Sequence, residues 1–260
     1  MKIAIVTNPK VSNTENVLAQ FKAELDANNL EYQVLDIDSL DSGFDFVCVI
    51  GGDGTILKTA RYYANYDTPI LGINRGRLGY LSQSDEKDIT KIVTAIKNKT
   101  YSIQERIMIK SGKYTALNDF VLKGSSCTRT AKFALSINDK YVCDYVADGI
   151  IISTPTGSTA YGLSAGGPIL SPKVEGLVIV PICPHSLTSR PLVVPTSEKI
   201  SIRTLDEKMN IAIDGQDYDG EVSACDIELS DKKAKLAFLN DDDYYTLLRN
   251  KLHWGVSITR

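Results

Sequence analysis

Short apolar runs alternate with amphipathic segments over the first 97 residues, and this alternation constrains the fold more than any other feature. The apolar runs of strand length are residues 2–7, 30–36, 45–50 and 69–73. The segments with apolar residues at helical spacing are the one that begins at Asn13, then 56–64 and 85–97. Strands separated by helices are typical of a parallel sheet. We therefore predict an α/β domain with a Rossmann-like parallel sheet.

The pattern changes near Asn98. From Tyr101 to Leu239 the chain has many short alternating runs separated by Gly, Pro, Asn-Asp and Ser-Asp, which is typical of an antiparallel sandwich. The runs are residues 103–110, 133–138, 141–147, 149–153, 177–181, 199–204, 209–213 and 233–238. We expect a helical insert at 158–165 and a short final helix at 241–252. The expected parts are an α/β domain (1–98), a β-sandwich domain (99–240) and a C-terminal helix and tail (241–260) that returns to the first domain.

The charge and the cysteines exclude several classes of protein. The chain has 29 Lys and Arg against 32 Asp and Glu, a formal net charge of −3, so no bulk positive field is available to attract nucleic acid or an anionic membrane. A local phosphate site remains possible, because backbone amides bind anions. Five cysteines without a Cys-x-x-Cys pair predict neither a zinc ribbon nor a disulfide framework, and favour a reduced, cytoplasmic location. The chain has no run of 18 apolar residues, so we expect no membrane-spanning helix.

A glycine loop, Gly51-Gly52-Asp53-Gly54-Thr55, follows the third apolar run and precedes a helix. Proteins with parallel sheets bind phosphates at this position, beside a helix N-terminus. The loop has neither the Walker A pattern nor G-x-G-x-x-G. A carboxylate repels phosphate, so Asp53 is informative: it fits a kinase loop in which it orients a hydroxyl nucleophile and takes its proton late in transfer. The alternative is a tight Asp-Gly turn in which Asp53 caps the helix.

A second polar segment follows a buried strand. Residues 154–161, Thr-Pro-Thr-Gly-Ser-Thr-Ala-Tyr, contain four Ser and Thr. Either they cap a helix that joins two strands, or they bind a ribose, a pyrophosphate or an amide, with Tyr161 stacked on a planar ring. The pair Asn118-Asp119 is similarly either a turn or a polar pair that contacts a ligand. His185, one of two histidines, lies beside a proline and favours a structural role.

Together these motifs closely resemble the NAD kinase family. The glycine loop alone is shared with lipid kinases and 6-phosphofructokinases, but the full set in this order is far more specific. The remaining motifs are the loop 72–79, Asn118-Asp119, the segment 148–161, Gly166-Gly167-Pro168-Ile169, and the stretch that begins at Pro184. The resemblance implies phosphorylation of the 2′-hydroxyl of the adenosine ribose of NAD to give NADP. It also implies ATP or polyphosphate as donor, and Mg²⁺ or another divalent cation bound with the donor phosphates.

The resemblance also implies roles for individual residues. Asp53 would be the catalytic carboxylate. The donor phosphates would contact Gly51, Gly52 and Thr55, with weaker candidates in Lys58 and Arg129. The NAD-binding residues would be Asp53, Gly54, Asn118, Asp119, Asp148, Thr156, Thr159, Ala160, Tyr161, Gly162, Leu163, Ser164 and Gln216. No dedicated metal cluster is expected, because the cation arrives with the phosphates. A homodimer or homotetramer is expected, without nucleic acid or membrane partners.

Two positions depart from the family pattern. The family's Asn-Glu pair is Asn118-Asp119 here, so the carboxylate is one methylene shorter. Val146 stands where several bacterial relatives carry a basic residue. Two competing functions are a lipid or sugar kinase built on the same glycine loop, and a dinucleotide-sensing module without turnover. Asp53 argues against the sensor, which has no use for a carboxylate beside phosphates.

Overall fold

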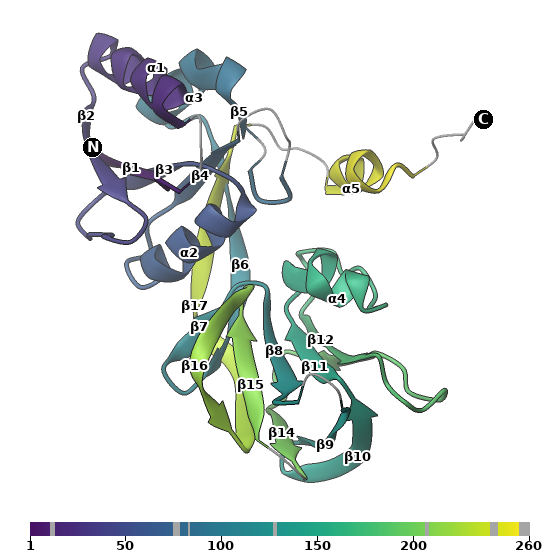
Figure 1. Cartoon of the computed structure of the whole chain (residues 1–260). Coiled ribbons are helices and arrows are strands. Elements are labelled where there is room, and N and C mark those ends of the chain that lie inside the picture. The colour runs from purple at the N-terminus through teal and green to yellow at the C-terminus, as the bar shows by residue number, and fades with distance from the viewer. Residues whose placement is uncertain are drawn as a thin grey trace. The chain divides into compact units, whose positions relative to one another are not determined.

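The computed structural model of the chain contains two compact units. It describes residues 1–10, 14–74, 79–82, 84–126, 129–205, 208–239 and 244–254, with the side chains of 217–220 excepted. The first unit comprises residues 1–105 and 235–260, and the second comprises residues 106–234, compared with boundaries at 98 and 240 expected from the sequence. The chain passes between the units within two strands, β6 (Ser102–Ser111) and β17 (Ala224–Phe238) (Figure 1).

The first unit is built on a parallel sheet. Its central strands follow the order β2-β1-β3-β4, and every neighbouring pair is parallel. The short strand β5 (Ser84–Asp85) and the end of β17 both pair with β4. The bounds of the four central strands are Lys2–Thr7 (β1), Glu31–Asp36 (β2), Phe46–Ile50 (β3) and Ile70–Asn74 (β4). They correspond to the four apolar runs of the sequence.

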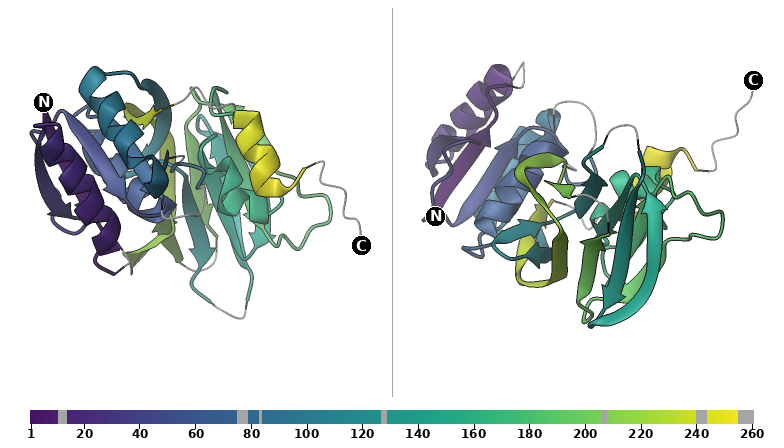
Figure 2. Two further views of the ribbon diagram at one scale, coloured as in Figure 1. Left: turned by 90° about the horizontal axis from the view of Figure 1, so that it is seen from above. Right: turned by 60° about the horizontal axis from the view of Figure 1, so that its bottom comes forward.

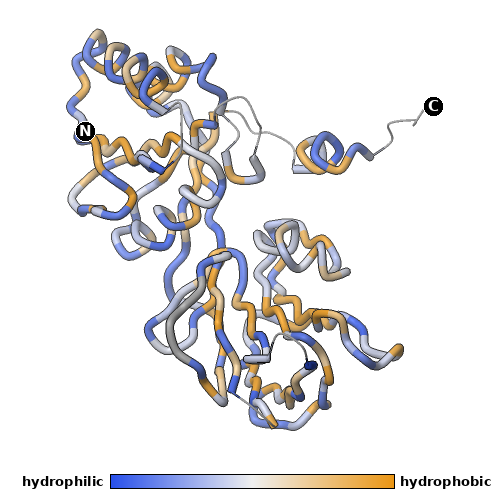
Figure 3. The backbone as a smooth tube through the Cα atoms, in the orientation of Figure 1, coloured by the Kyte–Doolittle hydropathy of each residue, from blue (hydrophilic) through white to orange (hydrophobic). Residues whose placement is uncertain are grey.

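Helices cover both faces of this sheet, which explains why β3 and β4 are buried at every position. Helices α1 (Thr14–Ala27) and α3 (Ile89–Asn98) lie side by side on one face (Figure 2), where Phe21 and Ile92 pack against alternate strand residues. Helix α2 (Asp53–Tyr63) covers the other face. Within the first unit, the hydrophobic colour follows these strands and parts of the helices (Figure 3).

The second unit is a β-sandwich. One sheet has six antiparallel strands in the order β13-β12-β11-β8-β15-β16, and the other includes β10-β9-β14-β17. Apolar side chains of both sheets, among them Phe120 and Phe133, form one buried core. The strand bounds are Tyr114–Ala116 (β7), Asp119–Gly124 (β8), Ala131–Ile137 (β9), Lys140–Ala147 (β10), Gly149–Ser153 (β11), Gly176–Ile182 (β12), Leu192–Pro195 (β13), Ile200–Thr204 (β14), Met209–Ile213 (β15) and Gln216–Val222 (β16). The predicted fold class, an α/β domain followed by an all-β domain, is confirmed.

A second apolar cluster lies on the opposite face of the six-stranded sheet. The cluster includes Val121, Ile151 and Val180, and Leu170 packs against it from the segment that follows helix α4 (Tyr161–Ser164). This explains why β11 and β12 are buried along their whole length rather than at alternate positions. The helical insert expected at 158–165 is shorter than expected. It consists of a 3₁₀ turn, Gly157–Thr159, and a single α-helical turn, α4 (Tyr161–Ser164).

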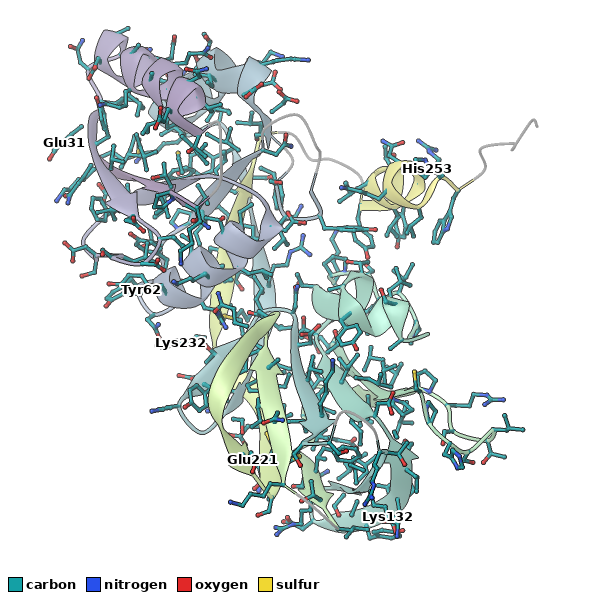
Figure 4. All side chains as sticks on the ribbon, in the orientation of Figure 1. Glu31, Tyr62, Lys132, Glu221, Lys232 and His253 are labelled. Carbon is teal, nitrogen blue, oxygen red and sulfur yellow. The ribbon has the colours of Figure 1, made fainter. Side chains whose placement is uncertain are left out.

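Several strands were not expected from the sequence. They are β5, β7, β8, β13 and β16, and β17 begins at Ala224 instead of residue 233. Strand β16 lies at a sheet edge and β2 at another, and both present acidic side chains, Glu221 and Glu31, that point outward (Figure 4). Charged side chains on edge strands oppose pairing with further chains.

The final helix is α5 (Tyr244–Leu252), which belongs to the first unit. Nζ of Lys251 lies 5.6 Å from the centre of the Tyr80 ring. The helix starts that were expected at Asn13 and Asp241 lie outside the described residues. Among the helices that the structure describes, none is long and apolar enough to cross a membrane. Cys48, Cys143, Cys183 and Cys225 are free thiols, and Cys127 is not among the described residues.

Candidate active site

Asp53 is the first residue of α2, directly after β3 and the glycines. Its carboxylate accepts main-chain hydrogen bonds from Tyr80 at 2.9 Å, Leu81 at 3.2 Å and Ser82 at 3.4 Å. The helix cap is Gly52, and no side chain caps the helix there. The carboxylate is therefore not a simple cap of its own helix: charge-assisted bonds from a loop nearly thirty residues away fix its direction.

The segment that holds Asp53 is closely packed around it. A Cβ atom on Gly79 would lie 2.1 Å from Oδ1 of Asp53 and 2.4 Å from Oγ of Ser82. The negative charge of Asp53 acts on Tyr80, because burial first and this charge second raise the pKa of the Tyr80 phenol. The glycine at position 79 thus lets three consecutive amides reach one carboxylate. Arg75, Gly76, Arg77 and Leu78, which belong to the predicted loop, lie outside the described residues.

The glycines of the loop fall into two kinds. A Cβ atom on Gly51 would lie 2.9 Å from Oγ1 of Thr55, so packing within the protein explains that glycine. Gly52 and Gly54 are exposed, and a Cβ atom on either would meet no protein atom within 4 Å. Neither has a positive φ angle. The fold itself therefore gives no reason for glycine at positions 52 and 54, whereas a ligand that approaches the backbone does.

The weaker phosphate candidates, Lys58 and Arg129, lie in different units and have different surroundings. Lys58 forms an ion pair with Asp38 at 2.5 Å, and Lys10 lies 3.6 Å from the same carboxylate. These two ammonium groups hold the pKa of Asp38 below its usual range. Arg129 is exposed and belongs to the second unit. Among the loop's predicted contacts, Thr55 is buried, and its main-chain N–H donates to the carbonyl of Gly52 at 3.0 Å.

The second unit contains a cavity of about 350 Å³ that gathers several of the predicted NAD-binding residues. Four predicted residues contribute to its wall, together with five that the sequence did not single out. The predicted ones are Asn118, Asp119, Ala160 and Tyr161, and the additional ones are Val121, Lys123, Ala212, Asp214 and Gly215. Nζ of Lys123 lies 5.3 Å from the centre of the Tyr161 ring. The cavity therefore combines an aromatic face, an ammonium group and two carboxylates.

Two other predicted NAD-binding residues, Asp53 and Gly54, belong to the glycine loop of the first unit, and the remaining ones belong to the second unit but do not line the cavity. Thr156 and Gly162 are buried, and Thr159 and Leu163 are half-buried. Asp148, Ser164 and Gln216 are exposed; Gln216 begins β16 directly after Gly215 of the wall.

Asp119 has an unusual electrostatic environment. It is 3% exposed at the start of β8. Burial, and then the negative charge of Asp214, raise the pKa of Asp119 from 3.8 to about 7. Burial favours the neutral carboxylic acid, and a neighbouring carboxylate does the same. Near neutral pH the group is thus present in both forms, and it donates a hydrogen bond in one and accepts in the other.

The polypeptide at Asn118 is fixed by the segment that follows β11. Oγ1 of Thr154 donates to the carbonyl of Leu117 at 2.6 Å, and the N–H of Thr154 donates to the carbonyl of Asn118 at 2.9 Å. A Cβ atom on Gly157 would lie 2.2 Å from that carbonyl oxygen. The hydroxyl-rich segment 154–161 therefore supports the Asn118-Asp119 pair, which is a role the sequence did not reveal.

The remaining expectations concern Val146, His185 and a metal cluster. The carbonyl of Val146 accepts a hydrogen bond of 2.8 Å from the main-chain N–H of His185, whose side chain is exposed. Within the described part of the chain, His, Cys, Asp and Glu side chains form no group of three or more that would hold a metal ion.

The chain is similar to known proteins over most of its length. Residues 3–101 match the family model of the ATP-NAD kinase N-terminal domain, and residues 117–238 match that of the ATP-NAD kinase C-terminal domain. An NAD kinase of Clostridium botulinum is 43% identical over 235 residues, which cover 86% of this chain and 84% of that protein. An NAD kinase of Azotobacter vinelandii is 40% identical over 226 residues, covering 81% of this chain and 76% of that protein.

Solved structures with the same fold include an NAD kinase from Archaeoglobus fulgidus in complex with ATP. Its TM-score is 0.82 at 25% identity, covering 97% of this chain and 99% of that one. A yeast NADH kinase complexed with NADH has a TM-score of 0.87 at 24% identity, covering 100% of this chain and 90% of that one, and supports the fold. Since both family models match and close relatives cover most of its length, the chain belongs to the NAD kinase family.

Proposed function

We propose that the chain transfers a phosphoryl group from ATP to the 2′-hydroxyl of the adenosine ribose of NAD, giving NADP, with Asp53 as the catalytic carboxylate. As a member of the NAD kinase family it is an enzyme, a phosphotransferase that phosphorylates NAD. The observation that carries the assignment to Asp53 is its position: a carboxylate fixed by three amides stands between two glycines whose side-chain space is open.

The donor phosphates are assigned to the glycine loop. Gly51, Gly52 and Thr55 surround the N-terminus of α2, where amides and the helix dipole favour anions. The open space beside Gly52 and Gly54 is what a phosphate chain would fill. Polyphosphate presents the same chemistry, so it is an alternative donor. Lys58 is tied to Asp38, and we give it no direct role.

The second-unit cavity is assigned to NAD. Its volume of about 350 Å³ lies near the lower end of the roughly 300–1,000 Å³ typical of small-molecule sites, so it would hold one end of a dinucleotide. The Tyr161 ring would stack on a planar ring, and Asn118 and Asp119 would bind ribose hydroxyls. The remaining residues proposed to surround the dinucleotide are Gly54, Asp148, Thr156, Thr159, Ala160, Gly162, Leu163, Ser164 and Gln216.

Asp53 would act mainly by orientation. A ribose hydroxyl is a poor nucleophile, and an aspartate is a weak base at neutral pH. In a loose phosphoryl-transfer transition state the hydroxyl proton leaves late, so a carboxylate held in a fixed direction aligns the attacking oxygen and then accepts the proton. The three amide bonds to Asp53 supply that fixed direction without any movement during the reaction.

A divalent cation, Mg²⁺ or another, fits these residues if it arrives with the donor. Mg²⁺ keeps several waters and is commonly held by one or two carboxylates together with substrate phosphates. Asp53 is one such carboxylate beside an open loop, and the described residues contain no preformed cluster that would compete with it. When bound, the cation neutralises charge that develops on the transferred phosphoryl group.

A coupled assay tests the function. The full chain is incubated with NAD, ATP and Mg²⁺, and NADP is detected with an NADP-specific dehydrogenase. Parallel reactions replace NAD by NADH, ATP by polyphosphate, or Mg²⁺ by Mn²⁺. A separate set, with labelled ATP, replaces NAD by a sphingoid base, a diacylglycerol or a sugar phosphate. NADP formation is expected. Absence of NADP under every condition would overturn the proposal, and label in a lipid or sugar would support the alternative kinase.

The assembly and the location of the enzyme are part of the same proposal. The family resemblance favours a homodimer or homotetramer in the cytoplasm, without nucleic acid or membrane partners. Free thiols at Cys48, Cys143, Cys183 and Cys225 agree with a reducing compartment. Light scattering coupled to gel filtration tests the assembly, and a monomer at micromolar concentration would contradict it.

A further inference from the structure

Asp214 lies in a tight turn on the wall of the second-unit cavity. The turn joins β15 and β16 through two residues, Asp214 and Gly215, whose φ angles are +49° and +74°. Positive φ at both central residues is the geometry of a type I′ hairpin, in which Asp-Gly and Asn-Gly are favoured. The turn itself thus accepts either Asp or Asn as its first residue, and the choice of a carboxylate needs another explanation.

That explanation lies in three hydrogen bonds. The carboxylate of Asp214 accepts from the main-chain N–H groups of Leu117 at 3.0 Å, Asn118 at 2.7 Å and Asp119 at 3.1 Å. In return, the N–H of Asp214 donates to the carbonyl of Asp119 at 3.1 Å. Three consecutive amides on one carboxylate are charge-assisted bonds, about twice as strong as bonds between neutral groups. An amide side chain has one oxygen in place of two and no charge.

We propose that Asp214 is a positioning residue for NAD: its carboxylate fixes the main chain at Asn118-Asp119, so that these two side chains meet the dinucleotide in one orientation. The proposal rests on the function assigned to this cavity above. The carbonyl side of the same segment is fixed independently, because Thr154 donates to the carbonyls of Leu117 and Asn118. Asp214 therefore completes a clamp that holds the segment from both its N–H and its C=O groups.

Replacing the carboxylate of Asp214 is expected to weaken the binding of NAD and not that of ATP. None of its three bonds involves the glycine loop, which belongs to the first unit. Loosening the Asn118-Asp119 segment removes binding interactions without changing Asp53 or the donor site. The Michaelis constant for NAD should therefore rise, while the constant for ATP and the turnover at saturating NAD change little.

The test compares Asp214→Asn with a matched control. Asn keeps the type I′ turn, so the variant is expected to fold. The control is Asp139→Asn, which changes an exposed Asp in another two-residue turn with positive φ, Asn138-Asp139, away from the cavity wall. In the full-length enzyme, Asp214→Asn should raise KM for NAD by about 10- to 100-fold, the loss expected for a bond to a charged group, with kcat within about threefold. Asp139→Asn should leave KM unchanged.

Amide hydrogen exchange supplies a second measurement that does not depend on turnover. In Asp214→Asn the amides of residues 117–119 should exchange faster, while those of α1 and β3 keep their protection. Unchanged exchange at 117–119, an unchanged KM for NAD, or an equal rise in KM for ATP would each overturn the proposal. So would loss of cooperative unfolding, which would make Asp214 a residue needed for folding. If the wild-type enzyme makes no NADP, it is the proposed function that fails. The amide exchange rates of residues 117–119 in wild type and Asp214→Asn would still show whether Asp214 fixes this segment.

Discussion

Gly79 and Asp53 lie so close together that a Cβ atom on Gly79 would be 2.1 Å from Oδ1 of Asp53. The next three residues donate their main-chain N–H groups to the same carboxylate. A side chain at position 79 would push this segment away and lengthen those bonds. The orientation of Asp53 therefore depends on the absence of a side chain 26 positions later in the chain.

The variant Gly79→Ala tests this dependence. We expect kcat to fall by at least about tenfold, because misplacing a catalytic group by about 1 Å costs on the order of 10²-fold. The measurement is the initial rate of NADP formation with both substrates saturating. Gly176→Ala is the control: a Cβ atom there would make ordinary contacts at 3.4 Å or more, and turnover should be retained. Equal turnover in Gly79→Ala and wild type would contradict the argument.

Asp53→Asn tests the carboxylate directly. The amide is nearly the same size, so folding and the KM values for NAD and ATP should stay within a few-fold of wild type. Turnover should fall by about 10²- to 10⁴-fold, the usual contribution of a positioned acid or base. Single-turnover kinetics separate the chemical step from binding. A variant with near-normal turnover would remove Asp53 from the catalytic role.

Much of the fold could be predicted from the sequence, because apolar periodicity reports burial. Strands β1, β3 and β4 are buried on both faces and read as continuous apolar runs. Strand β16 was not expected from the sequence, because it has no apolar run. Its sequence, Gln-Asp-Tyr-Asp-Gly-Glu-Val, is polar, and it lies at an edge where backbone pairing with β15 and the Asp214-Gly215 turn determine its position.

The site was predictable only in part, and the missing part is made of main-chain donors. The glycine loop has a recognisable pattern, but the amides of residues 80–82 that hold Asp53 are supplied by any residue type. The same applies to the amides at 117–119 that bind Asp214 almost a hundred residues away. The dipeptide Asp214-Gly215 between two alternating runs is a hairpin signal. It predicts a turn, but not the partners of the carboxylate.

Gly54→Ala separates stability from activity. Gly54 lies in the first turn of α2, is exposed and has space for a Cβ atom. Alanine in a helix is favoured over glycine by about 0.5–1 kcal/mol, so the variant should be as stable as wild type or slightly more stable. If phosphates or ribose approach the backbone there, KM for the ligands should rise or kcat should fall by about tenfold or more.

Denaturant unfolding and steady-state kinetics of Gly54→Ala provide the two measurements. A variant that is both stable and fully active would show that the space beside Gly54 stays empty during catalysis, which would contradict the assignment of the loop. A large loss of stability would instead indicate a packing role that the open space does not support.

Asp119 should make stability depend on pH. Burial first and Asp214 second raise the pKa of Asp119 from 3.8 to about 7, so the folded state binds its proton more tightly than the unfolded chain does. The contribution of Asp119 to the free energy of unfolding is therefore greatest below about pH 4. It decreases as pH rises toward about 7, and then stays constant. The slope for one proton is on the order of 1 kcal/mol per pH unit within that window.

Urea unfolding of wild type and Asp119→Asn between pH 4 and 8 measures this contribution. Asn resembles the neutral acid and does not titrate, so wild type should lose stability relative to the variant as pH rises and become the less stable protein near pH 7. Asp139→Asn alters an exposed carboxylate, so its free energy of unfolding should change with pH in the same way as that of wild type. A constant difference between wild type and Asp119→Asn across the range would show that Asp119 is ionised throughout. The cavity would then present a fixed negative pair to NAD instead of a group that both donates and accepts.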